Sequence, residues 1–171
     1  FVARLGREEA EALLAGMVLD TKQFTMRTGS RTFEAAAFLR RAGADTAEVK
    51  KLFQNDLEGT IAKYAIIQNA KLYREKIAIA VVDHTVGRIV AAQAADELLN
   101  IIGIDTSFVL YPDGERVIIS ARSMGDTNVQ VILEKLGGGG NAAAAGGQIS
   151  GKSLSQVATE LTQAIDQYLE G

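Results

Sequence analysis

The feature that most restricts the fold of this chain is a run of four consecutive glycines at residues 137–140. Each glycine loses more backbone freedom on folding than any other residue, so an ordered run of four needs a structural reason. One reason is a turn whose unobstructed N–H groups hold an anion, and the alternative is a flexible linker. The alanines at 142–145, in place of the Ser, Pro or Gln of a linker, favour the structured turn.

The residues before the glycines predict a helix over 127–136. Asp126 or Thr127 is expected to cap it, because a short side-chain oxygen accepts from the first N–H groups of a helix. Its apolar positions recur at helical spacing: Val129, Ile132, Leu133 and Leu136. A helix, a glycine turn and a segment of small residues therefore follow one another.

Composition excludes several classes of protein. The chain has 171 residues, of which 47% are hydrophobic and 23% charged, so it is globular, with one sizeable core or two small ones. The net charge of −3 argues against binding duplex nucleic acid, but it is compatible with a small phosphate-bearing ligand. Cysteine is absent, which excludes disulfides and thiolate metal sites and fits a reducing, cytoplasmic setting.

The start of the chain predicts a piece of a longer protein. It begins at Phe1 rather than Met and enters an amphipathic pattern at once. No signal peptide and no apolar run of about 20 residues is visible. A membrane anchor or further domains are therefore expected upstream.

The first part of the chain predicts only helices. They are expected at 7–18, 32–42, 46–54 and 57–71, where apolar residues recur at helical spacing. Asp45 and Glu48 form the pattern of a capping box at the third helix, and Gly43 is expected to end the second. We expect residues 1–55 to be the tail of one domain and residues 56–75 to be a connector helix.

From residue 76 the pattern changes to alternating strands and helices, which predicts a small α/β domain with a mixed sheet over 76–171. Ser153 and Gln156 form a capping box for the last helix. The expected elements are strands at 77–83, 107–111, 115–122 and 147–149, a helix at 88–102, a turn at 112–114 and a final helix from 154.

Two places in the helical part carry side chains suited to binding. Asp20 ends an apolar run, where a carboxylate serves either as a ligand for a hard metal ion or as an ordinary capping residue. Thr28, Ser30 and Arg31 precede a predicted helix, so their donors and the helix N-terminus would suit a phosphate. Ordinary capping by Ser30 is the alternative there.

Two further places lie in the α/β part. Arg122 and Ser123 follow a strand one helix ahead of the glycines, where a guanidinium could grip a phosphate with two hydrogen bonds or lie on the surface. His84, the sole histidine, follows Asp83 and is interpreted as a turn or capping residue, since no triad or zinc set accompanies it.

Two blocks together resemble the C-terminal portion of DHH-family phosphoesterases, and most closely the membrane-anchored cyclic-di-AMP phosphodiesterases of that family. The first block is residues 13–33, LLAGMVLDTKQFTMRTGSRTF, and it is the more specific one. The second runs from SARS at 120–123 to the glycines at 137–140. The resemblance covers almost the whole chain and implies the end of a DHH catalytic domain followed by a DHH-associated substrate-binding domain.

The resemblance also implies a reaction. Two Mn²⁺ ions in the catalytic domain would activate water to hydrolyse cyclic-di-AMP to linear pApA. Asp20 matches the last of the metal-ligand aspartates, and the other ligands and the catalytic residues belong to upstream motifs, so this chain alone is expected to be inactive. The expected substrate-binding residues are Arg122, Ser123, Gly137, Gly138, Gly139, Gly140 and Asn141, with Thr28, Ser30 and Arg31 from the first block.

One position departs from the family pattern. The family loop has a histidine after the glycines, whereas this chain has Asn141, which donates a hydrogen bond but carries no proton charge.

Other functions remain open from the sequence. One is an oligoribonuclease or nucleotide phosphatase of the same superfamily, and another is a non-catalytic module that binds nucleotide or mediates dimerisation. The expected partners are a cyclic dinucleotide or short oligonucleotide, the missing N-terminal part of the same chain and a second copy in a homodimer. The resemblance implies a parent anchored at the cytoplasmic face of the membrane.

Overall fold

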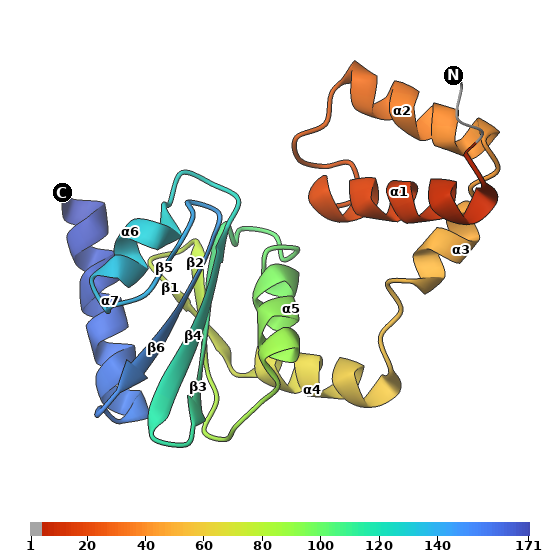
Figure 1. The fold of residues 1–171 in the computed structure, drawn as a ribbon. Helices are drawn as coiled ribbons and strands as arrows, with labels where there is room; N and C mark the ends of the chain where they lie inside the picture. Colours follow the sequence, from red (N-terminus) through yellow and green to blue (C-terminus); the bar gives the residue numbers. More distant parts are fainter. Residues whose placement is uncertain (1–4) are drawn as a thin grey trace. The chain divides into compact units, whose positions relative to one another are not determined.

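The computed structural model describes residues 5–171, which divide into two compact units with the boundary between Asn55 and Asp56 (Figure 1). The first unit is helical and the second holds all the strands of the described chain. None of the described helices is long and apolar enough to cross a membrane.

The first unit consists of α1 (Arg7–Asp20), α2 (Ser30–Arg41) and α3 (Thr46–Lys51), close to the ranges that the sequence predicts. Gly43 has a φ of 110° and ends α2 as expected. The three helices share a small apolar core, made of Ala10, Leu14, Leu39, Ala44 and Val49.

The predicted capping box of α3 forms only in part. The Asp45 side chain accepts from the Ala47 N–H, as a capping residue does. Glu48 pairs instead with Lys51. The reason is that the backbone N–H of Asp45, which a capping-box Glu48 would bind, already donates to the Glu11 carboxylate of α1 at 3.1 Å.

The second unit is built on a six-stranded mixed sheet in the order β1-β2-β3-β4-β6-β5. Strands β2 and β3 are parallel and the other neighbours are antiparallel. The strands are β1 (Ala70–Tyr73), β2 (Ile77–Val81), β3 (Thr106–Asp113), β4 (Arg116–Ser123), β5 (Gly139–Gly140) and β6 (Ala144–Ser150).

Helices cover the two faces of this sheet, so the unit has three layers (Figure 1). One face packs against α6 (Val129–Glu134) and α7 (Leu154–Glu170). The opposite face packs against α4 (Leu57–Gln68) and α5 (Arg88–Leu98). The mixed α/β class expected from the sequence is confirmed.

The sequence of β2 shows how the two faces differ. Ile77 and Ile79 lie in the core on the α7 side, whereas Ala78 and Ala80 lie in the core on the α5 side. Because successive side chains of a strand point to opposite faces, the alternation of Ile and Ala makes one face bulky and the other flat. The flat face meets α5, three of whose four buried residues are also small: Ala91, Ala94 and Ala95, the fourth being Leu98.

The connector predicted at 56–75 is a single helix only as far as Gln68. The next residues form β1, which pairs with β2 through a tight turn in which Arg74 and Glu75 both have positive φ. The turn is fixed by tertiary contacts, since the Tyr73 hydroxyl and the Arg74 guanidinium both donate to the Asp166 carboxylate of α7. Pairing with β2 therefore overrides the helical pattern of these residues.

Other boundaries shift for local reasons. Pro112 lies within β3 opposite Val117, and the chain turns at Gly114, whose φ is 62°. The cap of α6 is Asn128, whose side chain accepts from two N–H groups, and not Asp126 or Thr127.

The structure confirms the capping box of the last helix. The Ser153 hydroxyl accepts from the N–H of Gln156, and the Gln156 side chain accepts from the N–H of Ser153. The helix α5 is shorter than predicted, ending at Leu98.

Glu11 predicts a pH dependence for the first unit. Its carboxylate accepts from the Arg7 guanidinium at 2.9 Å and from the Asp45 N–H, and these two bonds, the first more than the second, lower its pKa. The stabilisation is complete above the unfolded pKa of about 4.3 and is lost as the pH falls through the lower folded pKa. Glu11→Gln should therefore make unfolding of this unit less dependent on pH below about 4.3, as measured by urea titrations followed on α1 amide signals. Glu8→Gln is the control, and equal pH profiles for both variants would contradict this role of Glu11.

Candidate functional site

The glycine run at 137–140 is an ordered helix end that continues into a strand. Gly137 has a φ of 82° and its N–H donates to the Glu134 carbonyl, while the Gly138 N–H donates to the Leu133 carbonyl at 2.8 Å. These two bonds form a Schellman motif, which satisfies the last carbonyls of α6. The linker interpretation is wrong, because the run is fixed at both ends.

Two of the glycines are required by close backbone approach. A Cβ on Gly138 would lie 2.6 Å from the Gly146 carbonyl oxygen of β6. Gly140 has a φ of 150°, and a Cβ there would collide with the backbone of Ala144 and Ala145. Gly139 is different, because a Cβ on it would meet no atom within 4 Å.

The expectation that the run presents free N–H groups to an anion is wrong for most of it. The N–H groups of Gly137 and Gly138 bind carbonyls of α6, and that of Asn141 donates to the Ala144 carbonyl at 2.8 Å. Gly139 and Gly140 pair with β6 as strand β5. The backbone of the run therefore serves mainly to bring β5 and β6 close together.

Asn141 closes the turn between β5 and β6. Its Oδ1 accepts from the N–H groups of Ala143 and Ala144, at 3.0 and 2.9 Å. The loop is tied to its surroundings as well, because the Ala142 carbonyl accepts from the Val129 N–H at the start of α6. An amide oxygen at this position thus holds the conformation of the whole turn.

Arg122 and Ser123 end β4 beside this turn, so the structure brings the predicted substrate-binding residues of the α/β part together. The Ser123 N–H donates to the Ala143 carbonyl at 2.9 Å, and Arg122 is in register with Ala144 of β6. We call Arg122, Ser123, Gly140 and Asn141 the turn cluster.

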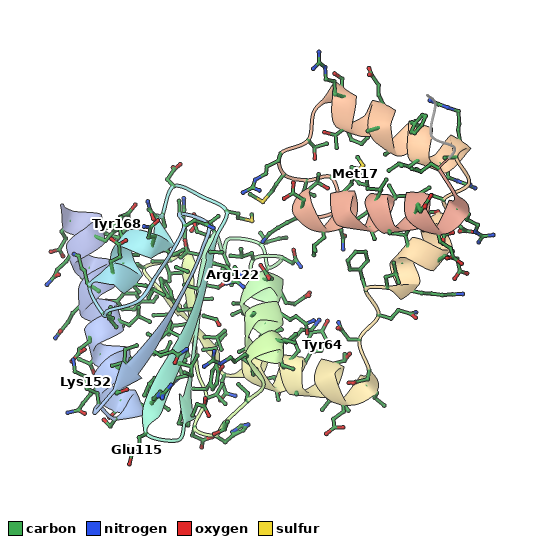
Figure 2. All side chains as sticks on the ribbon, in the orientation of Figure 1. Met17, Tyr64, Glu115, Arg122, Lys152 and Tyr168 are labelled. Atoms are coloured by element: carbon green, nitrogen blue, oxygen red, sulfur yellow. The ribbon has the colours of Figure 1, made fainter. Side chains whose placement is uncertain are left out.

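The Arg122 side chain is held in place rather than extended into solvent. Its Nε pairs with the Asp96 carboxylate of α5 at 3.2 Å, its Nη1 donates to the Ala121 carbonyl, and the side chain is only 18% exposed. Figure 2 labels it at the end of β4 beside α5. These contacts use two of the five N–H donors of the guanidinium and fix its direction.

The remaining predicted residues lie in the first unit, at the junction of α1 and α2. Asp20 is the last residue of α1 and pairs with Arg27 at 3.2 Å. The N-cap of α2 is Gly29, so Ser30 is its first helical residue and not its cap. The Thr28 hydroxyl donates to the Met26 carbonyl, and Arg31 is exposed.

The turn after Asp20 is strained. Lys22, Gln23 and Phe24 all have φ between 44° and 61°, the left-handed region that costs about 1–2 kcal/mol for each residue with a side chain. Hydrogen bonds around Thr21 hold it, since the Thr21 Oγ1 accepts from Phe24 and the Thr21 carbonyl accepts from Thr25 and Met26. Strained backbone of this kind concentrates at functional sites.

The described residues do not fit a pair of Mn²⁺ ions by themselves. Among residues 5–171 no group of three or more His, Cys, Asp or Glu side chains could hold a metal. Asp20 supplies one carboxylate, whereas a metal of this kind takes several oxygen ligands. The sole histidine, His84, pairs with its neighbour Asp83 at 3.0 Å, as expected for a turn residue.

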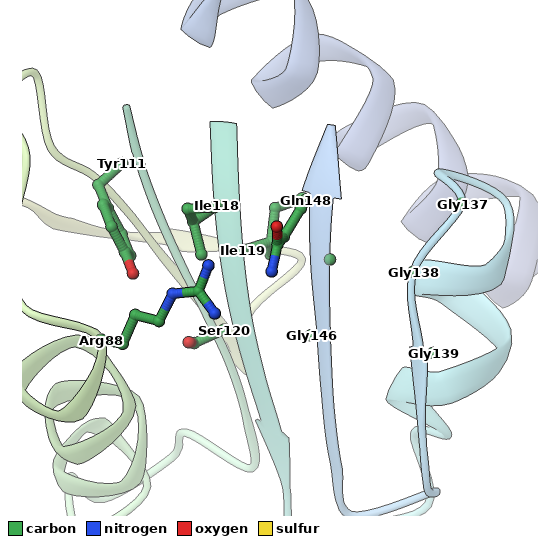
Figure 3. A pocket seen from close by; sticks show the side chains of 11 residues that line it. Arg88, Tyr111, Ile118, Ile119, Ser120, Gly137, Gly138, Gly139, Gly146 and Gln148 are labelled. Atoms are coloured by element: carbon green, nitrogen blue, oxygen red, sulfur yellow. The ribbon is translucent and has the colours of Figure 1, made fainter. Parts of the chain in front are cut away.

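The sequence did not reveal a pocket of about 460 Å³ on the α5 side of the sheet. Arg88 and Tyr111 line one part of it, and Ser120, Gln148 and the glycines at 137–139 and 146–147 line much of the rest (Figure 3). Its lining includes Gly137, Gly138 and Gly139 of the predicted substrate-binding residues, whereas Arg88, Tyr111 and Gln148 were not predicted. That α5 stops short of β6 and leaves this face open is decided by the tertiary structure.

The second unit is an α/β domain with a mixed sheet. At one end of this sheet, beside the turn cluster, glycines leave the backbone without large side chains. The chain belongs to the DHHA1 domain family, which matches residues 74–171.

Curated relatives match nearly the whole chain. It is 43% identical over 98% of its length to "Cyclic-di-AMP phosphodiesterase PdeA" of Listeria monocytogenes. It is 46% identical over 95% of its length to "Cyclic-di-AMP phosphodiesterase GdpP" of Bacillus subtilis. The chain spans only 26% of the length of each of these relatives.

A solved structure confirms the fold. The exopolyphosphatase-related protein of Bacteroides fragilis superposes with a TM-score of 0.86 over 95% of this chain and 51% of that one. Its sequence identity of 22% supports a shared fold and nothing more.

Alanine substitutions at three of the glycines are expected to differ in their effect on stability. Gly138→Ala and Gly140→Ala should each destabilise the second unit by about 1–3 kcal/mol, because the added Cβ meets backbone. Gly139→Ala should change the free energy of unfolding by less than about 1 kcal/mol, since its Cβ enters open space. Urea denaturation of the three variants measures this, and equal losses at all three positions would show that the close approach is not what requires glycine.

The hydrogen bonds of Asn141 predict that two substitutions at this position differ in their effect on stability. Asn141→Ala should destabilise the second unit by about 1–2 kcal/mol, because two N–H groups lose their acceptor. Asn141→Asp keeps an oxygen at Oδ1 and is the matched control, with a loss of less than about 0.5 kcal/mol. A thermal melt in which the two variants coincide would rule out the capping role.

Proposed function

We propose that this chain is the substrate-holding part of a phosphodiesterase that hydrolyses cyclic-di-AMP to linear pApA. The observation that carries the proposal is the identity of 43–46% to two proteins named as cyclic-di-AMP phosphodiesterases, over nearly the whole chain. The order of the parts supports it, since the DHHA1 match occupies the C-terminal part of the chain and the strained turn after Asp20 precedes it.

In this proposal the turn cluster binds the nucleotide. Arg122 is directed by Asp96 and the Ala121 carbonyl, so its remaining N–H donors form a rigid fork that matches phosphate oxygens. Ser123, Gly137, Gly138, Gly139, Gly140 and Asn141 set the shape of the surface next to it. Because most N–H groups of the glycines are already bonded, the guanidinium supplies the charge and the turn supplies the fit.

Thr28, Ser30 and Arg31 are proposed as a second set of phosphate contacts. They lie at the start of α2, which has 12 residues, and its first N–H groups favour an anion. The exposed Arg31 adds a positive charge there.

The proposed parent binds two Mn²⁺ ions with Asp20 as one ligand, and the other ligands come from residues beyond this chain. The parent is further proposed to be anchored in the membrane with this part at the cytoplasmic face, and to form a homodimer. Since the described residues offer one carboxylate where several ligands are needed, catalysis is a property of the whole parent.

Because most metal ligands are proposed to lie outside this chain, the chain alone is expected to bind the nucleotide without hydrolysing it. The 171-residue chain with Mn²⁺ should bind cyclic-di-AMP in calorimetry but release no pApA in a chromatographic assay. Arg122→Ala should weaken binding by about tenfold to a hundredfold, as the loss of a hydrogen bond to a charged group does. Lys71→Ala, which removes a charge from β1 at the other edge of the sheet, is the control and should bind normally.

Two results would contradict the proposal. Cleavage of cyclic-di-AMP by the chain alone would show that it is a complete enzyme. A full-length parent that hydrolyses linear dinucleotides much faster than cyclic-di-AMP would favour an oligoribonuclease instead.

A further inference from the structure

Two isoleucines lie in an exposed turn just after α5, where polar residues are usual. The Ile104 N–H donates to the Ile101 carbonyl at 3.1 Å, and Gly103 has a positive φ of 87°, so the chain reverses tightly here. Ile101 is exposed and Ile102 is fully exposed. Because exposed turns normally carry Gly, Pro, Asn, Asp or Ser, two apolar side chains at this place need a reason.

A third exposed apolar side chain lies beside this turn. Met124 directly follows β4 and is 59% exposed. Its N–H donates to the carbonyl of Asp105, the residue after the turn, at 3.0 Å. We call Ile101, Ile102 and Met124 the apolar rim. Exposed apolar side chains that gather in one place, unlike scattered ones, indicate a surface that binds a ligand or partner.

The apolar rim borders the guanidinium of Arg122 from two directions. Met124 lies two residues beyond Arg122, about 7 Å along the chain at the usual rise of a strand. Asp96 of α5 pairs with the Arg122 Nε, and Ile101 follows Asp96 by five residues, roughly 8 Å at the rise of a helix. The rim is thus close to a positive charge whose direction is fixed. None of its three residues lines the pocket of Figure 3.

A fixed charge beside an apolar surface has the chemistry that a nucleotide requires. The guanidinium fits phosphate oxygens, and every nucleobase has flat faces that pack against other groups whatever its identity. In a nucleotide the base and the phosphate are separated by one ribose, so a phosphate on Arg122 brings its base to the neighbouring side chains. Met124 suits such a surface, because methionine is flexible and adapts to the shape of what it contacts.

We propose that the apolar rim holds one adenine base of the nucleotide whose phosphate binds Arg122. This inference rests on the proposed function, which supplies both the adenine and the phosphate on Arg122. It adds a subsite to that function: the turn cluster contacts the phosphate, whereas Ile101, Ile102 and Met124 remove water from a face of the base. The base thereby covers apolar side chains that the protein itself leaves exposed.

The first test is an NMR titration with cyclic-di-AMP of the 171-residue chain, labelled at the methyl groups of Ile, Leu and Met. Adenine protons should give nuclear Overhauser effects to the methyl groups of Ile102 and Met124. They should give none to Leu72, which is 66% exposed on β1 at the edge of the sheet and is the matched control.

Calorimetry of variants measures how much the rim contributes. Ile102→Gln and Met124→Gln should each weaken the binding of cyclic-di-AMP by about threefold to tenfold, because part of the apolar burial is lost. Leu72→Gln should bind as the unaltered chain does. All three side chains are exposed, so the variants should melt with the unaltered chain, and weaker binding is then not a consequence of unfolding.

The outcomes separate this inference from the proposed function. If Arg122→Ala abolishes binding but the rim gives no Overhauser effect, or if both rim variants bind undiminished, the inference is overturned and the proposed function stands. Equal weakening by Leu72→Gln would also overturn the inference alone. A chain that does not bind cyclic-di-AMP at all would overturn both.

Discussion

Strand β6 determines how the far edge of the sheet is built, because its middle residues carry no side chain that a neighbouring backbone must avoid. Gly146 lies against Gly138 on one side and pairs with Ser120 of β4 on the other. This close approach fixes β5, the Schellman end of α6 and the loop that Asn141 closes. A side chain at any of these contacts would separate β5 from β6. The loop beside Arg122 and Ser123 would then be held less firmly.

The small residues of the sheet also make its two faces different. On the α7 side, Ile and other large residues form a dense core with α6 and α7. On the α5 side, alanines permit α5 to approach β2 and β3, and the glycines of β5 and β6 leave the neighbouring surface flat. The open pocket is the consequence, since a helix covers only part of a face that lacks large side chains to bury.

Much of the fold followed from local sequence. The periodicity of the helices, the capping box of Ser153 and Gln156, and the alternation of strands and helices after residue 76 were sufficient for the α/β class. The strand β1 and its left-handed turn could not be predicted, because Arg74 and Glu75 adopt positive φ only with the contacts of Asp166 and the pairing with β2. Likewise Pro112 was read as a turn, although the register with Val117 keeps it in a strand.

For the site, the sequence by itself determined which residues are unusual: four glycines, an arginine at a strand end and an asparagine where the family has histidine. Only the tertiary structure decided what they do. It bonds the N–H groups of Gly137 and Gly138 to the end of α6, directs Arg122 through Asp96, and leaves Tyr111 buried beside Arg88. The physical reason is that the type of a residue determines which bonds its side chain can form. The partners for those bonds lie on strands and helices that are distant in sequence and meet only in the folded chain.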